Sequence, residues 1–371
     1  MHKVSIVLPA YKEAGNILVL GDALHRVLSD HHGAYEIIIV DDHSQDGTEE
    51  QVAQLKMQGV SVDLLVRRDQ KGLSSAVLQG IAIAQGDIVV VMDADLSHPC
   101  AVIPQMVQML ADQQADFVIG SRYVAGGSLD QSWGRLRVLN SRIATWLSTL
   151  LVQVQDPMSG FFAFRRKDMP PAHVLSPIGY KIGLELLVKG RKKFCRVSEI
   201  PIHFRNRQYG NSKMSMAEQI RYVRHLRRLY AYAYPTLSEV MQFAMVGSVG
   251  FMVDLLLYLS LQTVFGLSHI LARGFAFWGA ASSNWILNRM LTFSSYQKTP
   301  KLQQWLLFLL ASCIGFAISW GSYTLLTLYV TFFMQHKIIA LFLGVVLGMA
   351  SNFVFCQNVV FKPLHQREDD A

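Results

Sequence analysis

The sequence predicts an α/β domain with a mostly parallel sheet, followed by an α-helical domain that spans a membrane four times. Up to about residue 121, short β-branched runs alternate with amphipathic helical patterns, as in strands joined by crossover helices. From Met241 to Phe361 the chain is almost uncharged, with six Asp, Glu, Lys or Arg residues in 121. This uneven distribution excludes a wholly soluble enzyme, a disordered protein and a secreted disulfide scaffold.

The first domain contains recognisable strands and helices in alternation. The predicted strands are Val4 to Leu8, Glu36 to Val40, Val60 to Val66, Asp87 to Met92 and Asp116 to Ile119. The clearest helical patterns between them are Ile17 to Leu28 and Leu73 to Ala84. In sheets of this kind, ligands bind beyond the carboxyl ends of the strands. The polar residues that follow the strands are therefore the first candidates for a functional site.

Charge and cysteine usage narrow the possible partners. The formal net charge is +7, which suits nucleic acid, an anionic membrane or a phosphorylated substrate. Basic residues interleaved with tyrosines precede the apolar region, at Arg221, Arg224, Arg227 and Arg228. This placement indicates a juxtamembrane segment facing anionic headgroups, and no nucleic-acid partner is expected. The four cysteines form no close pair, so we expect reduced, packed thiols.

Four membrane helices are expected at about 241–264, 270–291, 305–330 and 338–361, because a bilayer core requires about 20 apolar residues. The second is the weakest, since Arg273 and Arg289 leave only 15 uncharged residues between them. Positive charges before the first helix, between the second and third, and after the fourth place those segments in the cytosol. The amino terminus has no apolar run long enough for a signal peptide, so the first domain is also expected in the cytosol.

The membrane region contains an internal repeat. A string that ends at Phe293 recurs 68 positions later and ends at Phe361; Ser283-Asn284-Trp285 is matched by Ser351-Asn352-Phe353. A second string, from Phe243 to Gly250, recurs 65 positions later from Phe308 to Gly315. These matches predict two helical hairpins related by an axis along the membrane normal.

Two carboxylates close to each other give the strongest chemical signal. Asp93 and Asp95 follow the apolar run from Ile88 to Met92, so they stand at the end of a buried strand. Two such groups repel each other unless a cation lies between them, and a divalent ion with oxygen ligands is the natural partner. The pattern predicts a Mg²⁺ or Mn²⁺ site at this strand end.

Polar residues also follow the first two strands. Asp41 and Asp42 end the second strand and suit hydrogen bonds to ribose hydroxyls or to a base edge. At the end of the first strand, Tyr11 is placed to flank a flat ring, and Glu13 to accept a hydrogen bond from it. Together these residues predict a nucleoside site at the same edge of the sheet.

These motifs resemble those of the family 2 glycosyltransferases of GT-A fold, and within them the dolichyl-phosphate mannose synthases. The matching strings are Pro9-x-Tyr11-x-Glu13, Asp41-Asp42-x-Ser44-x-Asp46-Gly47-Thr48, Asp93-Ala94-Asp95-Leu96-Ser97-His98-Pro99, Gly120-Ser121-Arg122-Tyr123, Ser159-Gly160-Phe161 and Arg207-x-x-Gly210-x-Ser212-Lys213. The membrane region resembles the GtrA-like four-helix domains that are fused to some such synthases. We accordingly expect a GT-A domain at 1–213, basic juxtamembrane helices at 214–238, a GtrA-like domain at 239–362 and a cytosolic tail at 363–371.

The resemblance implies a role for each matching residue. It places Pro9, Tyr11, Glu13, Asp42, Asp93 and Lys213 at the donor nucleotide. It places Asp93 and Asp95 at the metal, and Ser97 where relatives often have a metal-binding Gln. The acceptor phosphate would contact Ser121, Arg122 and Arg135, and the sugar Asp156 and Glu185. Arg207 would stabilise the departing nucleoside diphosphate, which makes Asp93, Asp95 and Arg207 the expected catalytic residues.

The function implied is transfer of a hexose, with inversion, from a nucleotide sugar to a polyprenyl phosphate at the cytosolic membrane face. Mannose from GDP-mannose is the first candidate, and UDP-glucose or another UDP-sugar the alternative. The membrane would be a bacterial inner membrane or the endoplasmic reticulum. Polar residues in the apolar region, Asp254, Asn284, Asn288, Arg289 and Asn352, should face one another. They either join helices by hydrogen bonds or form a polar path that moves the lipid-linked sugar across the membrane.

Overall fold

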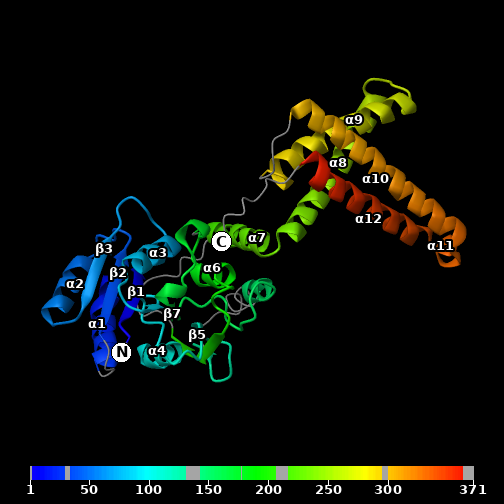
Figure 1. The fold of residues 1–371 in the computed structure, drawn as a ribbon. Helices are drawn as coiled ribbons and strands as arrows, with labels where there is room; N and C mark the ends of the chain where they lie inside the picture. Colours follow the sequence, from blue (N-terminus) through cyan, green and yellow to red (C-terminus); the bar gives the residue numbers. More distant parts are fainter. Residues whose placement is uncertain are drawn as a thin grey trace. The chain divides into compact units, whose positions relative to one another are not determined.

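The computed structural model describes residues 2–29, 34–130, 143–176, 178–205, 216–294 and 300–361. The chain divides into two compact units, Met1–Ala233 and Tyr234–Ala371 (Figure 1). The boundary falls inside the expected juxtamembrane segment, so the basic helix α7 (Met216–Ala233) belongs to the first unit.

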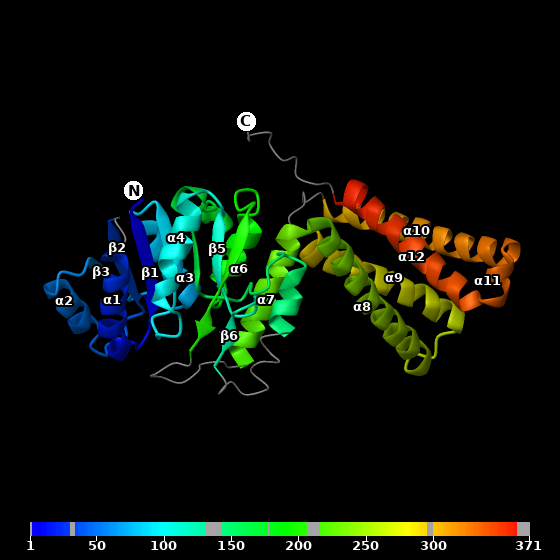
Figure 2. The ribbon, with the colours of Figure 1, turned by 90° about the horizontal axis from the view of Figure 1, so that it is seen from below.

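The first unit contains a seven-stranded sheet with the order β3-β2-β1-β4-β7-β5-β8. Figure 2 labels β1, β2, β3 and β5 of this sheet. The strands are β1 (Val4–Ala10), β2 (Tyr35–Asp41), β3 (Val62–Val66), β4 (Ile88–Val91), β5 (Phe117–Ser121), β7 (Phe162–Arg165) and β8 (Val197–Pro201). All strand pairs are parallel except those that β7 makes with β4 and β5. The five predicted strands and the mostly parallel sheet are confirmed. Strands β7 and β8 were not expected, and neither was a small sheet of β6 (Ser128–Leu129) and β9 (His203–Phe204).

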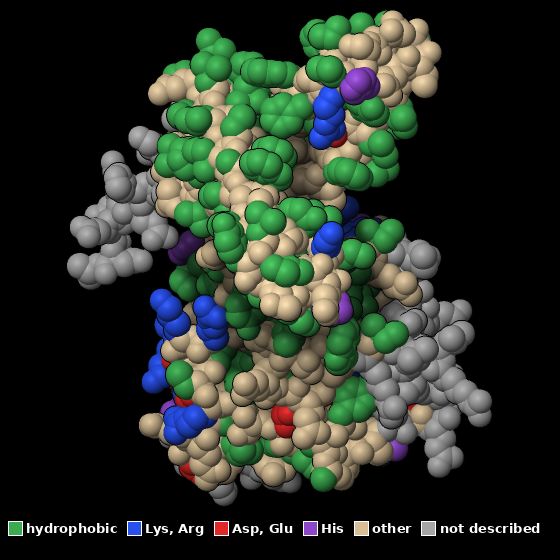
Figure 3. All heavy atoms as spheres, turned by 90° about the vertical axis from the view of Figure 1, so that its right-hand side faces the viewer, with side chains coloured by type: hydrophobic (Ala, Val, Ile, Leu, Met, Phe, Trp, Pro, Cys, Tyr) green, Lys and Arg blue, Asp and Glu red, His purple; other side chains and the backbone are tan. Residues whose placement is uncertain are grey.

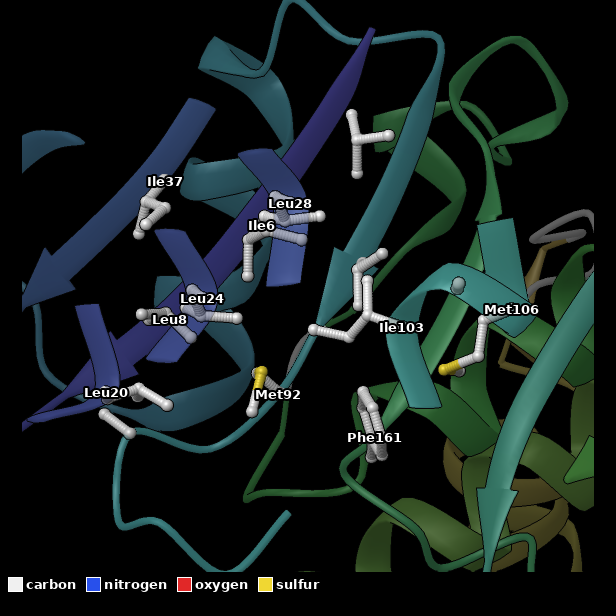
Figure 4. Close-up of a cluster of buried hydrophobic side chains, with 14 of the residues drawn as sticks. Ile6, Leu8, Leu20, Leu24, Leu28, Ile37, Met92, Ile103, Met106 and Phe161 are labelled. Atoms are coloured by element: carbon white, nitrogen blue, oxygen red, sulfur yellow. The ribbon is translucent and has the colours of Figure 1, made fainter. Parts of the chain in front are cut away.

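Helices cover both faces of the sheet because successive side chains of a strand point to opposite faces. They are α1 (Ala14–Ser29), α2 (Thr48–Met57), α3 (Leu73–Ile83), α4 (Ile103–Ala111) and α6 (Ile182–Lys189), with short 3₁₀ turns at Cys100–Val102, Arg166–Asp168 and Ala172–Val174. Ile6 and Leu8 of β1 lie in one buried cluster with side chains of α1 and α4 (Figure 4), and the same cluster includes residues of α2. Val7, between them, packs against α3 and α6 on the other face.

The order of the strands places a switch point between β1 and β4. The chain runs from β1 outward to β2 and β3, and then returns to place β4 on the other side of β1. Loops at the carboxyl ends of β1 and β4 therefore leave in opposite directions, which opens a crevice between them. Two of the predicted motifs, Pro9 to Glu13 and Asp93 to Ser97, follow these two strands.

Helix α7 packs on the first unit through an apolar face. Leu226, Leu229 and Ala233 lie in one buried cluster with Met158 and Leu184. The arginines of α7 therefore lie on a helix that is packed onto the rest of the first unit rather than on a free linker.

The second unit consists of long apolar helices. They are α8 (Pro235–Thr263), α9 (His269–Leu287), α10 (Lys301–Tyr329), α11 (Thr331–Gln335) and α12 (Lys337–Phe355), with π-helical turns at Asn288–Thr292 and Cys356–Val360. Three helical segments, Pro235–Thr263, Lys301–Tyr329 and Lys337–Val360, are long and apolar enough to cross a membrane. Many large hydrophobic side chains of this unit are exposed, and Figure 3 shows hydrophobic side chains spread over its surface. Helix α9, the predicted second span, contains Arg273 and is not among the three.

The internal repeat predicted from the sequence is present in the structure. Helices α9 and α12 have 19 residues each, and both continue into a five-residue π-helical turn. The aromatic residues that follow the two turns, Phe293 and Phe361, stack with ring centroids 4.6 Å apart. Matching close approaches occur in both hairpins, between Gly250 and Asn284 and between Gly315 and Asn352.

Candidate active site

A cavity of about 1180 Å³ lies at the carboxyl ends of β1, β2 and β4, within the first unit. Helices α3, α6 and α7 contribute other parts of its wall. Seven of the predicted site residues line it: Pro9, Tyr11, Glu13, Asp42, Asp93, Asp95 and Arg122. The structure thus brings together residues that are more than 100 positions apart in the sequence.

The loops that form the cavity are conformationally strained. Five non-glycine residues of the described chain have a positive φ angle, and four of them follow β1, β2 or β4: Lys12, His43, Gln45 and Leu96. A left-handed conformation costs such residues about 1 kcal/mol or more and persists only where the surroundings enforce it. Strain concentrated at one edge of the sheet is typical of a functional site.

Ser97 holds the turn that contains Asp95. Its hydroxyl donates to Asp95 Oδ1 at 2.5 Å, and its backbone N–H donates to the same oxygen at 3.1 Å. Leu96, between them, has a φ of 62°. Ser97 is fully buried and does not line the cavity. In this structure the hydroxyl orients the Asp95 carboxylate, and metal binding by Ser97 stays a prediction.

His98 supports the same turn and was not singled out from the sequence. Its Nδ1 accepts a hydrogen bond from the Asp93 backbone N–H at 3.2 Å, which leaves the hydrogen on Nε2. The ring stacks on Phe161 with centroids 5.1 Å apart and meets Phe204 edge-on. Burial lowers the pKa of His98 in spite of the nearby Asp93 and Asp95 charges, so the ring is neutral near pH 7.

The carboxylates of Asp93 and Asp95 fit a divalent cation. Both line the cavity, and within the described residues no cluster of three or more His, Cys, Asp or Glu side chains could enclose an ion. Mg²⁺ is commonly held by one or two carboxylates, with water and substrate phosphates completing its shell. A Cβ on Gly160 would lie 3.3 Å from both Asp93 oxygens, so the glycine leaves room for this carboxylate. The donor set is therefore compatible with an ion shared with a phosphorylated substrate.

The expected nucleoside residues lie on the β1, β2 and α3 side of the cavity. Asp42 accepts a hydrogen bond from the Gly72 N–H at 2.7 Å and pairs with Arg67 at 3.2 Å. The Tyr11 ring has the ammonium groups of Lys12 and Lys71 each 5.6 Å from its centroid. Lys71 also lines the cavity. An aromatic ring beside cationic side chains suits a flat base linked to phosphates.

Arg122 is held by Asp156. Arg122 Nε and Nη2 each donate to a different Asp156 oxygen at 2.8 Å, and the Arg122 backbone N–H donates at 3.0 Å. Asp156 is fully buried and lies outside the cavity lining. The prediction that it contacts the sugar is therefore wrong for this structure, because its carboxylate faces Arg122. Ser121, expected at the acceptor phosphate, is likewise fully buried at the end of β5 and away from the lining.

Glu185 joins α6 to α7 instead of lining a sugar pocket. Its Oε2 lies 3.1 Å from His225 Nε2, and its Oε1 accepts from Lys189 Nζ and from the Ser176 N–H, each at 2.6 Å. Burial would raise the pKa of Glu185, but the bonds from His225, Lys189 and Ser176 lower it to about 2. The structure does not place Glu185 at a sugar pocket. Glu185 instead belongs to a buried ion-pair cluster that joins α7 to α6.

Lys181 is a cavity residue to which the sequence assigned no role. It lines the cavity immediately before α6, and its Nζ donates to the Met158 carbonyl at 2.7 Å. Burial and the Arg122 charge lower the pKa of Lys181 to about 8, against the opposing effects of Asp156 and Asp93. Three other predicted residues, Arg135, Arg207 and Lys213, lie outside the described residues.

Polar residues of the membrane unit contact one another. Arg273 of α9 pairs with Asp254 of α8. Arg289 donates to Gln304, whose amide is buried and lies 3.4 Å from the Val360 carbonyl. Asp254 and Arg289 thus contact polar partners, Arg273 and Gln304, that the sequence-based prediction did not name.

Comparisons with known proteins identify both units. The family model for glycosyl transferase family 2 matches residues 5–170, and that for the GtrA/DPMS transmembrane domain matches residues 242–361. A dolichol-phosphate mannosyltransferase of Pyrococcus furiosus is 33% identical over 97% of this chain and 99% of its own length. The enzyme of that name from Saccharomyces cerevisiae is 38% identical over 62% of this chain and 88% of its own.

Among solved structures, a glucosyl-3-phosphoglycerate synthase from Mycobacterium tuberculosis is similar with a TM-score of 0.47 and 21% identity. The match covers 62% of this chain and 80% of that one. It is described in complex with Mn²⁺, UDP and glucosyl-3-phosphoglycerate. From its identity to the Pyrococcus furiosus protein along nearly its whole length, together with both family matches, this chain is a glycosyltransferase and belongs to the dolichol-phosphate mannosyltransferase family.

Proposed function

We propose that this protein transfers mannose from GDP-mannose to a polyprenyl phosphate at the cytosolic face of a membrane, with inversion at the anomeric carbon. The relatives named dolichol-phosphate mannosyltransferase support this choice of donor sugar and acceptor. The observation that carries it is a single cavity lined by a carboxylate pair, Asp93 and Asp95, and by cationic side chains that include Lys71 and Arg122. Such a site suits two anionic substrates that must approach each other.

The acceptor explains why the reaction needs no side-chain base. An alcohol would have to be deprotonated by a protein group as it attacks. A phosphate monoester has a second pKa of about 6, so it is already a dianion near neutral pH. One of its oxygens forms the new bond to the anomeric carbon while the bond from that carbon to the donor diphosphate breaks. The electron pair leaves with GDP, and no proton has to move.

The residues of the cavity lower the electrostatic barrier between the substrates. Arg122 presents a guanidinium whose Nε and Nη2 are fixed by Asp156, so it is oriented before the substrate arrives. Asp93 and Asp95 would hold a divalent cation, which supplies positive charge to the donor diphosphate when bound. Ser97 and His98 keep the Asp93–Asp95 turn in place through their hydrogen bonds. Arg207 and Lys213 are proposed, from the family motif, to bind the leaving diphosphate.

The membrane unit is proposed to keep the enzyme where its acceptor lies. A polyprenyl chain leaves the bilayer at a cost of about 0.8 kcal/mol for each CH₂ group, so the phosphate must be met at the interface. We propose that α9 is a fourth membrane span, in which Asp254 compensates the charge of Arg273. We also propose that the membrane is a bacterial inner membrane and that both ends of the membrane domain lie on its cytosolic side. For the polar residues of this unit, a role in helix packing is preferred to a path for the lipid-linked sugar, because the described contacts are made between helices.

The proposal is tested by incubating the full-length protein with labelled GDP-mannose or UDP-glucose and a polyprenyl phosphate, with and without a chelator. We expect label from GDP-mannose in the lipid fraction, and loss of this product when the chelator is present. Transfer of label from UDP-glucose instead would show that the donor is UDP-glucose rather than GDP-mannose. Absence of transfer to the lipid from either donor would contradict the proposed function.

A further inference from the structure

Lys181 places a positive charge in the cavity wall, and no carboxylate of the described residues forms an ion pair with it. Its Nζ donates to the Met158 carbonyl at 2.7 Å, and the Tyr180 ring centroid lies 4.7 Å away. Among the residues that the structure describes, no Asp or Glu oxygen lies within 4.0 Å of this nitrogen. Its contacts within the described ranges are therefore with a neutral carbonyl and an aromatic face.

This arrangement is unfavourable for the protein alone. Removing an ammonium from water costs free energy that is recovered mainly by a nearby counter-charge. Lys181 also stands immediately before α6, at the positive end of the helix dipole, where a cation gains nothing. Arg122, another cation of this cavity, has its guanidinium engaged by Asp156 at 2.8 Å. In the described part of the protein, Lys181 therefore has no direct ion-pair partner, and the Asp156 and Asp93 charges act on it only from a longer distance.

We propose that Lys181 binds a phosphate oxygen of a substrate in the cavity, so that its counter-ion arrives with the ligand. The charges of Arg122, Asp156 and Asp93 are close enough to act on its ammonium, which places it near both the proposed acceptor contact and the proposed metal carboxylate. The phosphate belongs either to the nucleoside diphosphate or to the lipid monoester. The inference rests on the proposed function, since both ligands are substrates or products of that reaction.

The first experiment compares K181M and K181R with the wild type as full-length proteins in detergent. Methionine keeps the length and apolar stem of lysine but removes the charge. We expect K181M to lower kcat/KM by about 10- to 100-fold, the effect of losing one charge-assisted hydrogen bond, and K181R to retain more activity than K181M. K56M is the matched control, because Lys56 pairs with Asp63 at 3.3 Å on the exposed surface; its kcat/KM should stay within two-fold of wild type.

The melting temperature separates ligand binding from a structural role. Removing a poorly compensated charge should leave the melting temperature of the ligand-free protein unchanged or raise it. A structural lysine would do the opposite. K181M that is destabilised or unfolded, or that keeps kcat/KM within two-fold of wild type, would contradict the proposal.

A second experiment uses the wild type alone. Acylation of lysines by a succinimidyl ester is followed by mass spectrometry with GDP, citronellyl phosphate, inorganic pyrophosphate or no addition, and the rate at Lys181 is divided by the rate at Lys56. Protection of Lys181 by GDP and pyrophosphate assigns it to the donor, and protection by citronellyl phosphate assigns it to the acceptor. No protection by any of them would overturn the inference. Because this readout requires no turnover, it remains informative if mannosyl transfer is not observed.

Discussion

The pair formed by Arg122 and Asp156 gives the sharpest test of how the cavity is built. Asp156 accepts three hydrogen bonds from Arg122, at 2.8, 2.8 and 3.0 Å, and has no exposed surface. In D156N, one oxygen becomes an NH₂ group that faces an arginine N–H, and the charge that balances the guanidinium is lost. Breaking a buried ion pair in this way destabilises a protein by about 3 to 5 kcal/mol.

For a unit of this size, that loss corresponds to a fall in melting temperature of about 6 to 20 °C. The assay is thermal unfolding of the full-length protein followed by intrinsic fluorescence, with D63N as the control. Asp63 pairs with Lys56 on the exposed surface, so D63N should lower the free energy of unfolding by less than about 1 kcal/mol. The double variant R122M/D156N should lose less free energy of unfolding than R122M and D156N lose together, by about 1 to 3 kcal/mol. An unchanged melting temperature in D156N, with a raised KM for the nucleotide sugar, would return Asp156 to the sugar pocket and refute this reasoning.

Three further predictions concern other contacts. Because the pKa of Glu185 is about 2 in the folded protein against an ordinary value of 4.5, its contribution to stability is present above pH 4.5 and is lost as the pH falls toward 2. The difference in melting temperature between wild type and E185Q should therefore shrink over this range. G160A should reduce activity by about 10-fold or more with little loss of stability, because its Cβ would lie 3.3 Å from both Asp93 carboxylate oxygens. G250A should destabilise the membrane unit, because its Cβ would overlap the Asn284 side chain, and G250A/N284A should recover part of the loss.

The controls for these variants come from the same chain. Within the described residues, no heavy atom other than those of its chain neighbours and its own helix backbone lies within 4 Å of the position that an added Cβ would occupy at Gly321. G321A is therefore the matched control for both glycine substitutions and should leave activity and melting temperature unchanged. If the difference in melting temperature between E185Q and wild type stayed constant from pH 5 down to pH 2, Glu185 would not be stabilised in its ionised form by the cluster. Full activity in G160A, or a stable G250A, would show that the corresponding close approach is not required.

The sequence predicted the parts of the fold that local patterns determine. Val4 to Leu8 and the other four predicted strands are β-branched runs bounded by polar residues, and each is a strand in the structure. Strand β7 (Phe162–Arg165) was missed because it is antiparallel to both of its neighbours, β4 and β5, so it does not belong to the alternation of parallel strands and helices. The repeat in the membrane unit was predictable because the copies keep the same residues, such as Asn284 and Asn352, at the helix contacts.

Residue roles were predicted less well because they depend on which partner a side chain meets. Asp93 and Asp95 were found correctly at the cavity, since a strand end fixes where they point. Asp156 and Glu185 are acidic residues in matching motifs, and only the fold shows that Arg122, Lys189 and His225 occupy their oxygens. Lys181 was overlooked because a lysine in the sequence gives no indication of its burial or of a missing counter-ion.

The central claim is that Asp93 and Asp95 hold a cation that binds the donor diphosphate at the carboxyl edge of the sheet. The most direct measurement is anomalous diffraction from crystals grown with Mn²⁺ and GDP. The account predicts an anomalous peak within about 2.0 to 2.6 Å of an Asp93 or Asp95 oxygen, with the nucleotide phosphates bound to the same ion. A nucleotide bound elsewhere, or bound in this cavity with the manganese peak away from both carboxylates, would contradict it.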